Sequence, residues 1–275
     1  MIYFSQLVNI TGGKNLQFHT DHSIESISID SRKASANPST LFFAIKGERH
    51  DGHGYIGNLY REGVRQFVVE QPLAILTDFP EANFLLVQSA VAALQQIAAF
   101  HRSAFSYPVI GITGSNGKTI IKEWLFQMLS KDKIVVKNPG SYNSQVGVPL
   151  SVWQMGSHHQ MGIFEAGISR PGEMSKLESV IQPTIGILTN IGSAHDEGFL
   201  GLDQKIEEKL SLFKDSQVLI YCADQENVES AVQKSGVKTF SWGSKADADV
   251  KISVQENICH VTVAGQSHVI KLPFS

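Results

Sequence analysis

The chain has 275 residues, of which 42% are hydrophobic and 18% are charged, and its formal net charge is -3 at pH 7. This composition is typical of a folded globular protein and offers no basic surface for nucleic acid. The N-terminus has no basic segment followed by an apolar one, and no run approaches the roughly 20 apolar residues of a membrane span. Two cysteines are too few for a disulfide framework. We therefore expect a cytoplasmic protein of one or two domains that does not insert into a membrane.

The first part of the chain alternates short apolar runs with turns. Four runs rich in β-forming residues lie at 27–29, 40–45, 67–70 and 84–87. They predict a small α/β domain over residues 1–86. Residues 88–105 then carry apolar side chains at helical spacing, and we expect this helix to open a second domain over residues 87–275.

The second part of the chain repeats a pattern of strand, loop and helix. Its five continuous apolar runs lie at 109–112, 134–136, 162–164, 185–188 and 218–221. Continuous rather than alternating runs suit a parallel sheet covered by helices on both faces. Two later runs, 250–254 and 260–263, predict antiparallel edge strands. The expected fold class is therefore α/β, with a small N-terminal domain and a central domain built on a mostly parallel sheet flanked by helices.

The most specific local motif is a glycine-rich turn after the apolar run 109–112, which ends in Gly-Lys-Thr. A helix follows, and we expect its apolar face to comprise Ile120, Ile121, Trp124, Leu125, Met128 and Leu129. In such a turn backbone N–H groups surround phosphate oxygens, the lysine reaches the terminal phosphates and the threonine hydroxyl binds Mg²⁺. The sequence thus predicts a nucleoside triphosphate site made of Gly114, Ser115, Asn116, Gly117, Lys118 and Thr119.

This turn departs from the common phosphate loop, because Ile112 stands where that spacing has its first glycine. The segment 113–119 instead resembles the phosphate loop of the Mur ligases, which lack that glycine. Four further stretches resemble the same family in the same order and together cover nearly the whole chain. The resemblance implies ATP and Mg²⁺ as cofactors.

In the first domain, Asp30-Ser31-Arg32 and the stretches around Lys46 and His53 are similar to the N-terminal domain shared by the MurE and MurF types. That domain binds the UDP part of the substrate. The resemblance implies that Ser31 and Arg32 lie beside the nucleotide, with Lys46 and His53 as further candidates. Hydroxyl and guanidinium donors suit a uracil edge or a pyrophosphate. The alternative is a polar turn after a strand.

The stretch 138–150 is similar to the MurF-type sequence in which paired asparagines precede Gly-x-Pro-Leu, and it differs from the Thr-Thr-Pro version of the MurE type. Asn143 is the first of the pair and Ser144 replaces the second, and both are implied to bind substrate. The stretch 164–174 resembles the element E-x-G-x-x-x-x-G-E of the family. It implies that Glu165, at the end of a strand, binds Mg²⁺ together with Thr119.

Two further residues are implied to act near the phosphates. His195 matches the histidine of N-x-x-x-A-H, which assists a second metal site in the family. Lys209 matches the lysine of A-K-x-x-L-F, which CO₂ converts to a carbamate. Because Ile206, Leu210 and Phe213 mark the buried face of that helix, we expect Lys209 at its edge. The resemblance thus assigns catalytic roles to Lys118, His195 and Lys209.

The implied reaction joins D-alanyl-D-alanine to UDP-MurNAc-tripeptide through an acyl phosphate, with consumption of ATP. This step belongs to peptidoglycan biosynthesis, and so to cell wall biogenesis, cell shape and cell division. The family has a third, C-terminal domain that closes on the nucleotide, and this chain ends before it. We therefore expect ligand binding with weak or no ligation.

Two alternative functions stay open at this point. One is another Mur-type ligase, such as MurE or a cyanophycin-type or folylpolyglutamate-type relative. The other is a P-loop protein that binds nucleotide without ligation.

Overall fold

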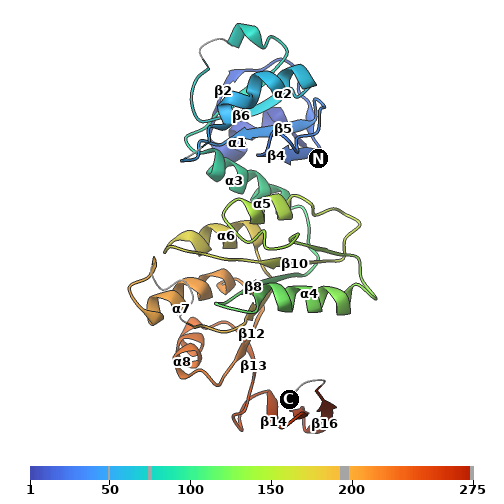
Figure 1. The fold of residues 1–275 in the computed structure, drawn as a ribbon, viewed down its shortest axis with the longest axis vertical. Coiled ribbons are helices and arrows are strands. Elements are labelled where there is room, and N and C mark those ends of the chain that lie inside the picture. The colour runs from blue at the N-terminus through green and yellow to red at the C-terminus, as the bar shows by residue number, and fades with distance from the viewer. Residues whose placement is uncertain (49, 74–75, 193–197, 273–275) are drawn as a thin grey trace. The chain divides into compact units, whose positions relative to one another are not determined.

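The computed structural model describes residues 1–48, 50–73, 76–192 and 198–272. The chain folds into two compact units: Met1–Phe105 with Val152–Gln154, and Ser106–Ser151 with Met155–Ser275 (Figure 1). Each unit contains both helices and strands, which confirms the predicted α/β class.

The first unit is built on a five-stranded sheet in the order β2-β7-β6-β5-β4, parallel except for the β2–β7 pair. Its elements are β1 (Ile2–Tyr3), α1 (Leu7–Thr11), β2 (Lys14–Gln17), β3 (Ser23–Ile24), β4 (Ser26–Ser28), β5 (Thr40–Ala44), α2 (Ile56–Glu62), β6 (Gln66–Val69), β7 (Asn83–Leu86) and α3 (Ala90–Arg102), with short 3-10 turns at Phe4–Gln6, Gly52–Tyr55 and Leu76–Asp78. The strands β5 and β6 are fully buried, as expected for parallel strands covered on both faces. Phe67 stacks on Phe84 at 5.1 Å between ring centroids in this core.

The helix α3 belongs to the first unit, whereas the sequence pattern predicted it to open the second domain. It contacts α1 and β5 through an apolar face that includes Leu94 and Ile97. Its first turn is also held from within this unit, because the Ala90 N–H donates to Glu70 Oε1 at 2.7 Å. The expected boundary at residue 86 therefore falls before α3, and the boundary between the compact units falls after it.

The second unit is built on a nine-stranded sheet in the order β16-β15-β14-β13-β12-β11-β8-β10-β9. Its elements are β8 (Val109–Thr113), α4 (Lys118–Leu129), β9 (Val135–Lys137), α5 (Gly147–Val152), β10 (Met161–Glu165), α6 (Glu173–Ile181), β11 (Ile185–Leu188), α7 (Leu202–Leu210), the 3-10 turn η5 (Ser211–Phe213), β12 (Val218–Cys222), α8 (Glu226–Ser235), β13 (Thr239–Gly243), β14 (Val250–Gln255), β15 (Ile258–Val263) and β16 (Gln266–Lys271). The strands from β9 to β14 pair in parallel, and β14, β15 and β16 pair antiparallel. Strands are present at both predicted positions, as β14 and β15, but neither is an edge strand: β14 pairs in parallel with β13, and β16 forms the edge of the sheet. The sequence pattern missed β13 and β16.

Helices cover the two faces of the parallel part of this sheet. On one face Ile110, Ile112 and Ile163 pack against Ile121 and Leu125 of α4. On the other face η5 approaches closely, and a Cβ on Gly186 would lie 2.5 Å from the Phe213 ring. Glycine at this position of β11 therefore allows Phe213 to pack directly on the sheet.

The expected apolar face of α4 is only half correct. Ile121, Leu125 and Leu129 pack on the sheet, but Ile120, Trp124 and Met128 are 57%, 62% and 58% exposed. The two sets lie on neighbouring stripes of the helix, and only one stripe can face the sheet.

Among the described residues, no helix combines the length and the apolar character that crossing a bilayer requires.

The strand order identifies where a ligand site is expected. Strand β8 has β10 on one side and β11 on the other. The chain therefore adds β9 and β10 on one side of β8 and the later strands on the other, which makes β8 a switch point of the sheet. Ligands of open parallel sheets bind beyond the carboxyl ends of strands at such a switch point. The loops after β8, β10 and β11 meet there.

Candidate active site

The phosphate loop joins the buried end of β8 to the first turn of α4. Gly114 has a φ of +146° and Gly117, the N-cap of α4, has a φ of +80°, values that residues with a Cβ rarely adopt. A Cβ on Gly114 would also lie 1.9 Å from the Thr189 hydroxyl, just beyond β11. The loop therefore depends on glycine both for its backbone conformation and for its contact with the loop after β11.

Hydrogen bonds fix the phosphate loop to the loop after β11. The Ser115 N–H donates to the Asn190 carbonyl at 2.7 Å, and the Asn116 N–H donates to the Asn190 side chain at 3.0 Å. The Thr189 hydroxyl donates to the Asn116 carbonyl at 2.6 Å. Since these two loop amides are engaged, the donors that suit a phosphate are the first-turn amides of α4, which have no acceptor within the helix.

Lysines surround this loop. Lys118 Nζ donates to the carbonyls of Gly114 at 2.9 Å and Ser115 at 3.3 Å. From α7, Lys209 Nζ donates to the same Gly114 carbonyl at 3.3 Å, and Lys205 Nζ donates to the Gly192 carbonyl. The site is therefore strongly cationic, which suits a polyphosphate.

Lys209 is buried rather than at the helix edge, with 3% of its surface exposed. Burial lowers the pKa of Lys209 to about 8, and the positive charges of Lys118 and Lys205 add to this effect. Burial also lowers the pKa of Lys118, although the carboxylate of Glu165 opposes that shift. Lys209 therefore loses its proton more easily than an exposed lysine.

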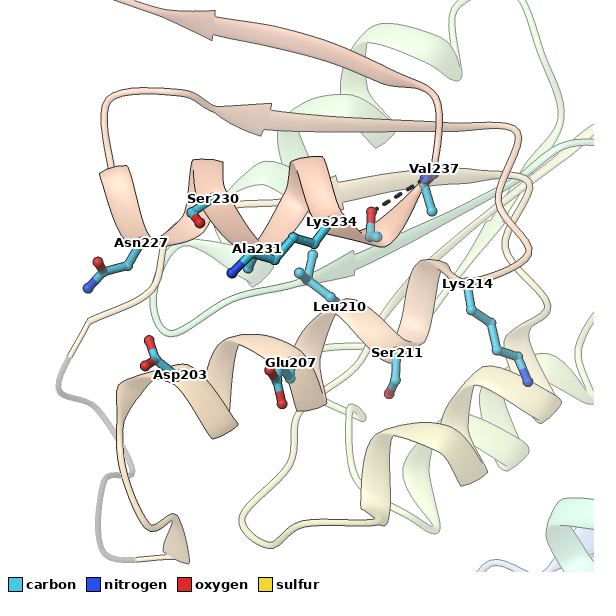
Figure 2. Close-up of a pocket in the computed structure, with 11 residues that line it drawn as sticks. Asp203, Glu207, Leu210, Ser211, Lys214, Asn227, Ser230, Ala231, Lys234 and Val237 are labelled. Atoms are coloured by element: carbon cyan, nitrogen blue, oxygen red, sulfur yellow. Dashed lines mark hydrogen bonds between the residues drawn. The ribbon is translucent and has the colours of Figure 1, made fainter.

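The opposite face of α7 lines a separate groove of about 580 Å³ between α7 and α8 (Figure 2). Asp203 and Glu207 face this groove, while Lys205 and Lys209 face the phosphate loop, as their two-residue offset on a helix requires. Helix α7 thus carries the two carboxylates on one face and the two lysines on the other. The groove is lined by Asp203, Glu207, Leu210, Ser211, Lys214, Asn227, Ser230, Ala231, Lys234, Ser235 and Val237.

Glu165 ends β10 as a fully buried carboxylate. Its Oε1 accepts a hydrogen bond from Asn143 Nδ2 at 2.9 Å, while its Oε2 has no hydrogen-bond partner. Burial of a carboxylate oxygen without a hydrogen-bond donor costs free energy unless a cation or a ligand contacts that oxygen. Among the described residues no three His, Cys, Asp or Glu side chains cluster as a metal site. This single oxygen therefore fits Mg²⁺, which binds through one or two carboxylates plus substrate phosphates.

Of the other candidates in the second unit, three lie in α4 or on the loop after β9, and one lies outside the described residues. Thr119 is half-buried in the first turn of α4, and Asn143 contacts Glu165 directly. Ser144 is exposed, and its hydroxyl accepts a hydrogen bond from the Gly147 N–H at 3.1 Å, at the start of α5. His195 lies within residues 193–197, outside the described part of the chain.

In the first unit, Arg32 and Asp30 form a bidentate ion pair after β4. Arg32 Nε and Nη2 donate to the two carboxylate oxygens at 2.9 and 2.8 Å. These hydrogen bonds lower the pKa of Asp30 to about 2. The Arg32 side chain is nevertheless 86% exposed, so its outer edge is accessible to a ligand. Ser31 lies between these two residues and is half-buried.

Lys46 and His53 meet around Glu70 in the same unit. The His53 ring is 6% exposed; its Nδ1 lies 2.5 Å from Asp51 Oδ1, and its Nε2 accepts the Glu70 N–H at 3.0 Å. Both ring nitrogens are thus engaged within the protein, which argues against a ligand contact by His53. The Lys46 N–H donates to Glu70 Oε2 at 3.1 Å, and its exposed side chain is available for ligand.

Comparison with known proteins supports the same interpretation of this geometry. A family model described as "Mur ligase middle domain" matches residues 112–275, and one described as "Mur ligase family, catalytic domain" matches residues 23–102. The chain belongs to the Mur ligase family. The resemblance carried by its phosphate loop is thereby confirmed.

Individual Mur ligases resemble the chain over most of its length. The UDP-N-acetylmuramoyl-tripeptide--D-alanyl-D-alanine ligase of Bacillus subtilis is 30% identical over 255 residues, which are 91% of this chain and 54% of that protein. A crystal structure of MurF from Acinetobacter baumannii has a TM-score of 0.82 and 28% identity, and covers 98% of this chain and 60% of that one. MurF ligase from Thermotoga maritima in complex with ADP has a TM-score of 0.78 and 27% identity over 90% of this chain and 57% of that one. The chain thus spans a little over half the length of these relatives.

Several residues that hold the candidate site residues in place escaped the sequence interpretation. They are Glu70 in the first unit, and Lys122, Asn138, Asn190 and Lys205 in the second. Most act through long-range hydrogen bonds, which local patterns do not reveal. The lysines did carry a signal, because Lys122 follows Lys118 by one helical turn and Lys205 precedes Lys209 by one turn. Lysines repeated at this spacing beside a phosphate loop indicate a shared cationic face.

Proposed function

We propose that the chain supplies the UDP-substrate and ATP sites of a MurF-type ligase, which joins D-alanyl-D-alanine to UDP-MurNAc-tripeptide in peptidoglycan synthesis. One observation carries the proposal: Asn143, from the stretch that resembles the MurF type, orients the buried Glu165 carboxylate beside the phosphate loop. The names of the relatives support the same reaction. The proposal includes a cytoplasmic location, where ATP is available.

In the proposed reaction, the tripeptide carboxylate takes the γ-phosphoryl group of ATP and forms an acyl phosphate and ADP. The amine of D-alanyl-D-alanine then attacks the acyl carbon, phosphate leaves, and the amine loses a proton. No nucleophile from the protein is needed, so the contribution of the chain is binding, orientation and charge. Lys118 and the first-turn amides of α4 hold the phosphates. Mg²⁺ held by Glu165 and Thr119, with His195 as a further candidate ligand, would neutralise phosphate charge.

Lys209 is proposed to react with CO₂ and form a carbamate. The step joins the neutral amine to the carbon of CO₂ and releases one proton. The lowered pKa of Lys209, about 8, supplies a useful fraction of neutral amine near neutrality. A carbamate would also replace one of three clustered positive charges by a negative one, which relieves the repulsion by Lys118 and Lys205.

The first domain is proposed to hold the UDP part of the substrate. Arg32 is fixed by Asp30 but exposed, so a diphosphate can bind its free edge without breaking the ion pair. Ser31, beside it, adds a hydroxyl donor. Within this proposal the first unit, which extends beyond the expected boundary at residue 86 to include α3, binds UDP, and the second unit binds ATP, with Asn143 and Ser144 as candidate contacts to the peptide.

Calorimetry tests the proposal with two ligands, the non-hydrolysable ATP analogue AMP-PNP with Mg²⁺, and UDP-MurNAc-tripeptide. We expect both to bind saturably, Glu165→Gln to weaken only the first, and Arg32→Ala to weaken only the second. Binding of the nucleotide without any binding of the UDP precursor would leave a P-loop nucleotide-binding protein as the better description. Absence of nucleotide binding would contradict the proposal altogether.

A further inference from the structure

Lys122 is a fully buried lysine in α4, one helical turn beyond Lys118. Its Nζ donates to the carbonyl oxygens of Asn138 at 3.1 Å and of Gly140. An ammonium group is rarely buried without a specific set of partners, because desolvation of the charge is costly. The position of Lys122 between α4 and the loop after β9 therefore calls for an explanation beyond packing.

The loop that Lys122 holds is the one that holds Glu165. The Asn138 side chain accepts the Glu165 N–H at 2.7 Å and donates to the Glu165 carbonyl at 3.3 Å. Five residues further along the same loop, Asn143 donates to Glu165 Oε1. Lys122 thus fixes the segment that positions both the backbone and the carboxylate of Glu165.

The charge of Lys122 is also placed so that Glu165 Oε2 stays available. Lys122 Nζ lies 3.7 Å from this oxygen, which is close enough for electrostatic attraction but too long for a hydrogen bond. The short hydrogen bonds of Lys122 go to carbonyl groups instead, and its other ionic neighbour is Glu123, whose Oε1 lies 3.5 Å from Lys122 Nζ. An ordinary buried ion pair would occupy the carboxylate oxygen directly.

We infer that Lys122 is a positioning residue for the metal-binding carboxylate: by holding the turn at 138–140 it aims Glu165 Oε2 at the phosphate loop and sets Asn143 in place. This inference rests on the proposed function. One buried side chain would then align three parts of the site: helix α4, the Glu165 carboxylate and the loop after β9 that carries Asn143.

The test measures metal binding directly. Mn²⁺ replaces Mg²⁺ and is titrated, with AMP-PNP present, by electron paramagnetic resonance, and water relaxation counts the waters on the bound ion. The variants are Lys122→Met, Glu165→Gln and the double variant. Lys137→Met is the matched control. Lys137 pairs with Glu123, the carboxylate that also lies 3.5 Å from Lys122 Nζ, and its ammonium lies over the Phe126 ring, but it donates neither to the 138–140 carbonyls nor to Glu165. Thermal unfolding and AMP-PNP binding in EDTA report on the fold.

We expect Lys122→Met to weaken Mn²⁺ binding roughly 10–100-fold, the range seen when groups that orient metal ligands are removed. The bound Mn²⁺ should gain a water, as in Glu165→Gln, while metal-free AMP-PNP binding stays near that of the unchanged protein. The double variant should lose little more than either single variant, because both act through one carboxylate. Lys137→Met should bind Mn²⁺ normally.

Two results would overturn the inference. One is a folded Lys122→Met variant with unchanged Mn²⁺ affinity, and the other is a double variant whose losses add. If Lys122→Met does not fold, two milder variants of the same loop, Lys122→Gln and Asn143→Ala, take its place. Both must then show the loss of Mn²⁺ affinity. Normal Mn²⁺ binding by both would also overturn the inference. If the unchanged protein binds no Mn²⁺ with AMP-PNP, the proposed function fails together with the inference, and that outcome is recognised before any variant is compared.

Discussion

Lys118 and Lys209 donate to the same backbone oxygen, the carbonyl of Gly114, at 2.9 and 3.3 Å from their Nζ atoms. The two lysines come from different helices, α4 and α7, so the contact joins these helices at the phosphate loop. Their like charges repel, and burial strengthens the repulsion because the local dielectric is low. The site without ligand therefore carries an electrostatic cost that an anion would relieve.

The first prediction concerns the stability cost of Lys209. Its pKa is about 8 in the folded protein against 10.5 for an ordinary lysine, so the unfolded chain binds more protons between these two pH values. Stability should therefore rise as the pH increases from 8 to 10.5, by at most about 3 kcal/mol. Lys209→Met should lack this rise and should be more stable than the unchanged protein at pH 7.

Urea unfolding at pH 7 and at pH 10 measures this difference. Lys234→Met is the control, because Lys234 is an exposed lysine on the groove between α7 and α8. Its free energy of unfolding should follow that of the unchanged protein at both pH values. A Lys209→Met variant that is less stable at pH 7 would show that the ammonium group stabilises the fold and would contradict the prediction.

The second prediction is that Gly114→Ala disrupts the phosphate loop. The new Cβ would lie 1.9 Å from the Thr189 hydroxyl, at a φ of +146°. Backbone strain of this kind costs about 1–3 kcal/mol, and the clash would also push apart the loops after β8 and β11. We expect a lower unfolding temperature and loss of AMP-PNP binding, measured by calorimetry.

The matched control is Gly192→Ala on the facing loop. Its Cβ would lie 3.9 Å from Asn116 Nδ2, which is ordinary contact distance. This variant should keep its stability and its nucleotide affinity. Equal damage in both variants would mean that the loop region tolerates no substitution, and the specific role of Gly114 would be refuted.

The third prediction assigns His53 a structural role. Its ring bridges Asp51 and the Glu70 N–H, and Glu70 in turn binds the N–H groups of Lys46 and Ala90. Loss of the ring leaves the N–H of the half-buried Glu70 without this acceptor, which costs at most about 1–3 kcal/mol. His53→Ala should lower the unfolding free energy by this amount, while UDP affinity of the folded protein, measured by calorimetry, stays unchanged. His50→Ala, at an exposed neighbour, should change neither quantity. A selective loss of UDP affinity in His53→Ala would restore it as a ligand residue.

Much of the fold was predictable because its signals are local. The five apolar runs of the second unit became β8, β9, β10, β11 and β12, since parallel strands covered on both faces are apolar throughout. The phosphate loop was equally accessible, because Gly114, Gly117 and Lys118 satisfy a backbone requirement within a few residues. Periodicity failed for α4, where Trp124 is apolar but lies on the stripe that faces away from the sheet.

The rest of the site depends on contacts between distant segments. The burial of Lys209 could not be read from its helix, because the residues that cover it belong partly to the loop at Gly114, 95 positions away in the chain. The same holds for Asn190, which ties down the phosphate loop from 74 positions away. The boundary after α3 likewise follows from the packing of α3 on α1 and β5. The helical pattern in the sequence does not indicate which domain such a helix packs against.

The last prediction concerns recognition of UDP in the first unit. Arg32→Ala should weaken UDP binding roughly tenfold or more in calorimetry, because a charge-assisted hydrogen bond to the diphosphate is lost. Protein stability should not change, since exposed ion pairs contribute little. The pKa of Asp30 is about 2 against an ordinary value of 3.8, so the carboxylate stays ionised above pH 4, and any stabilisation by the pair would be lost as the pH falls from 3.8 through about 2. Asp30 should thus add no pH dependence to UDP binding between pH 5 and 8.

Arg61→Ala, which removes another exposed arginine of the same unit, is the control and should bind UDP normally. Unchanged affinity in Arg32→Ala, or an equal loss in both variants, would show that UDP binds elsewhere or by charge alone.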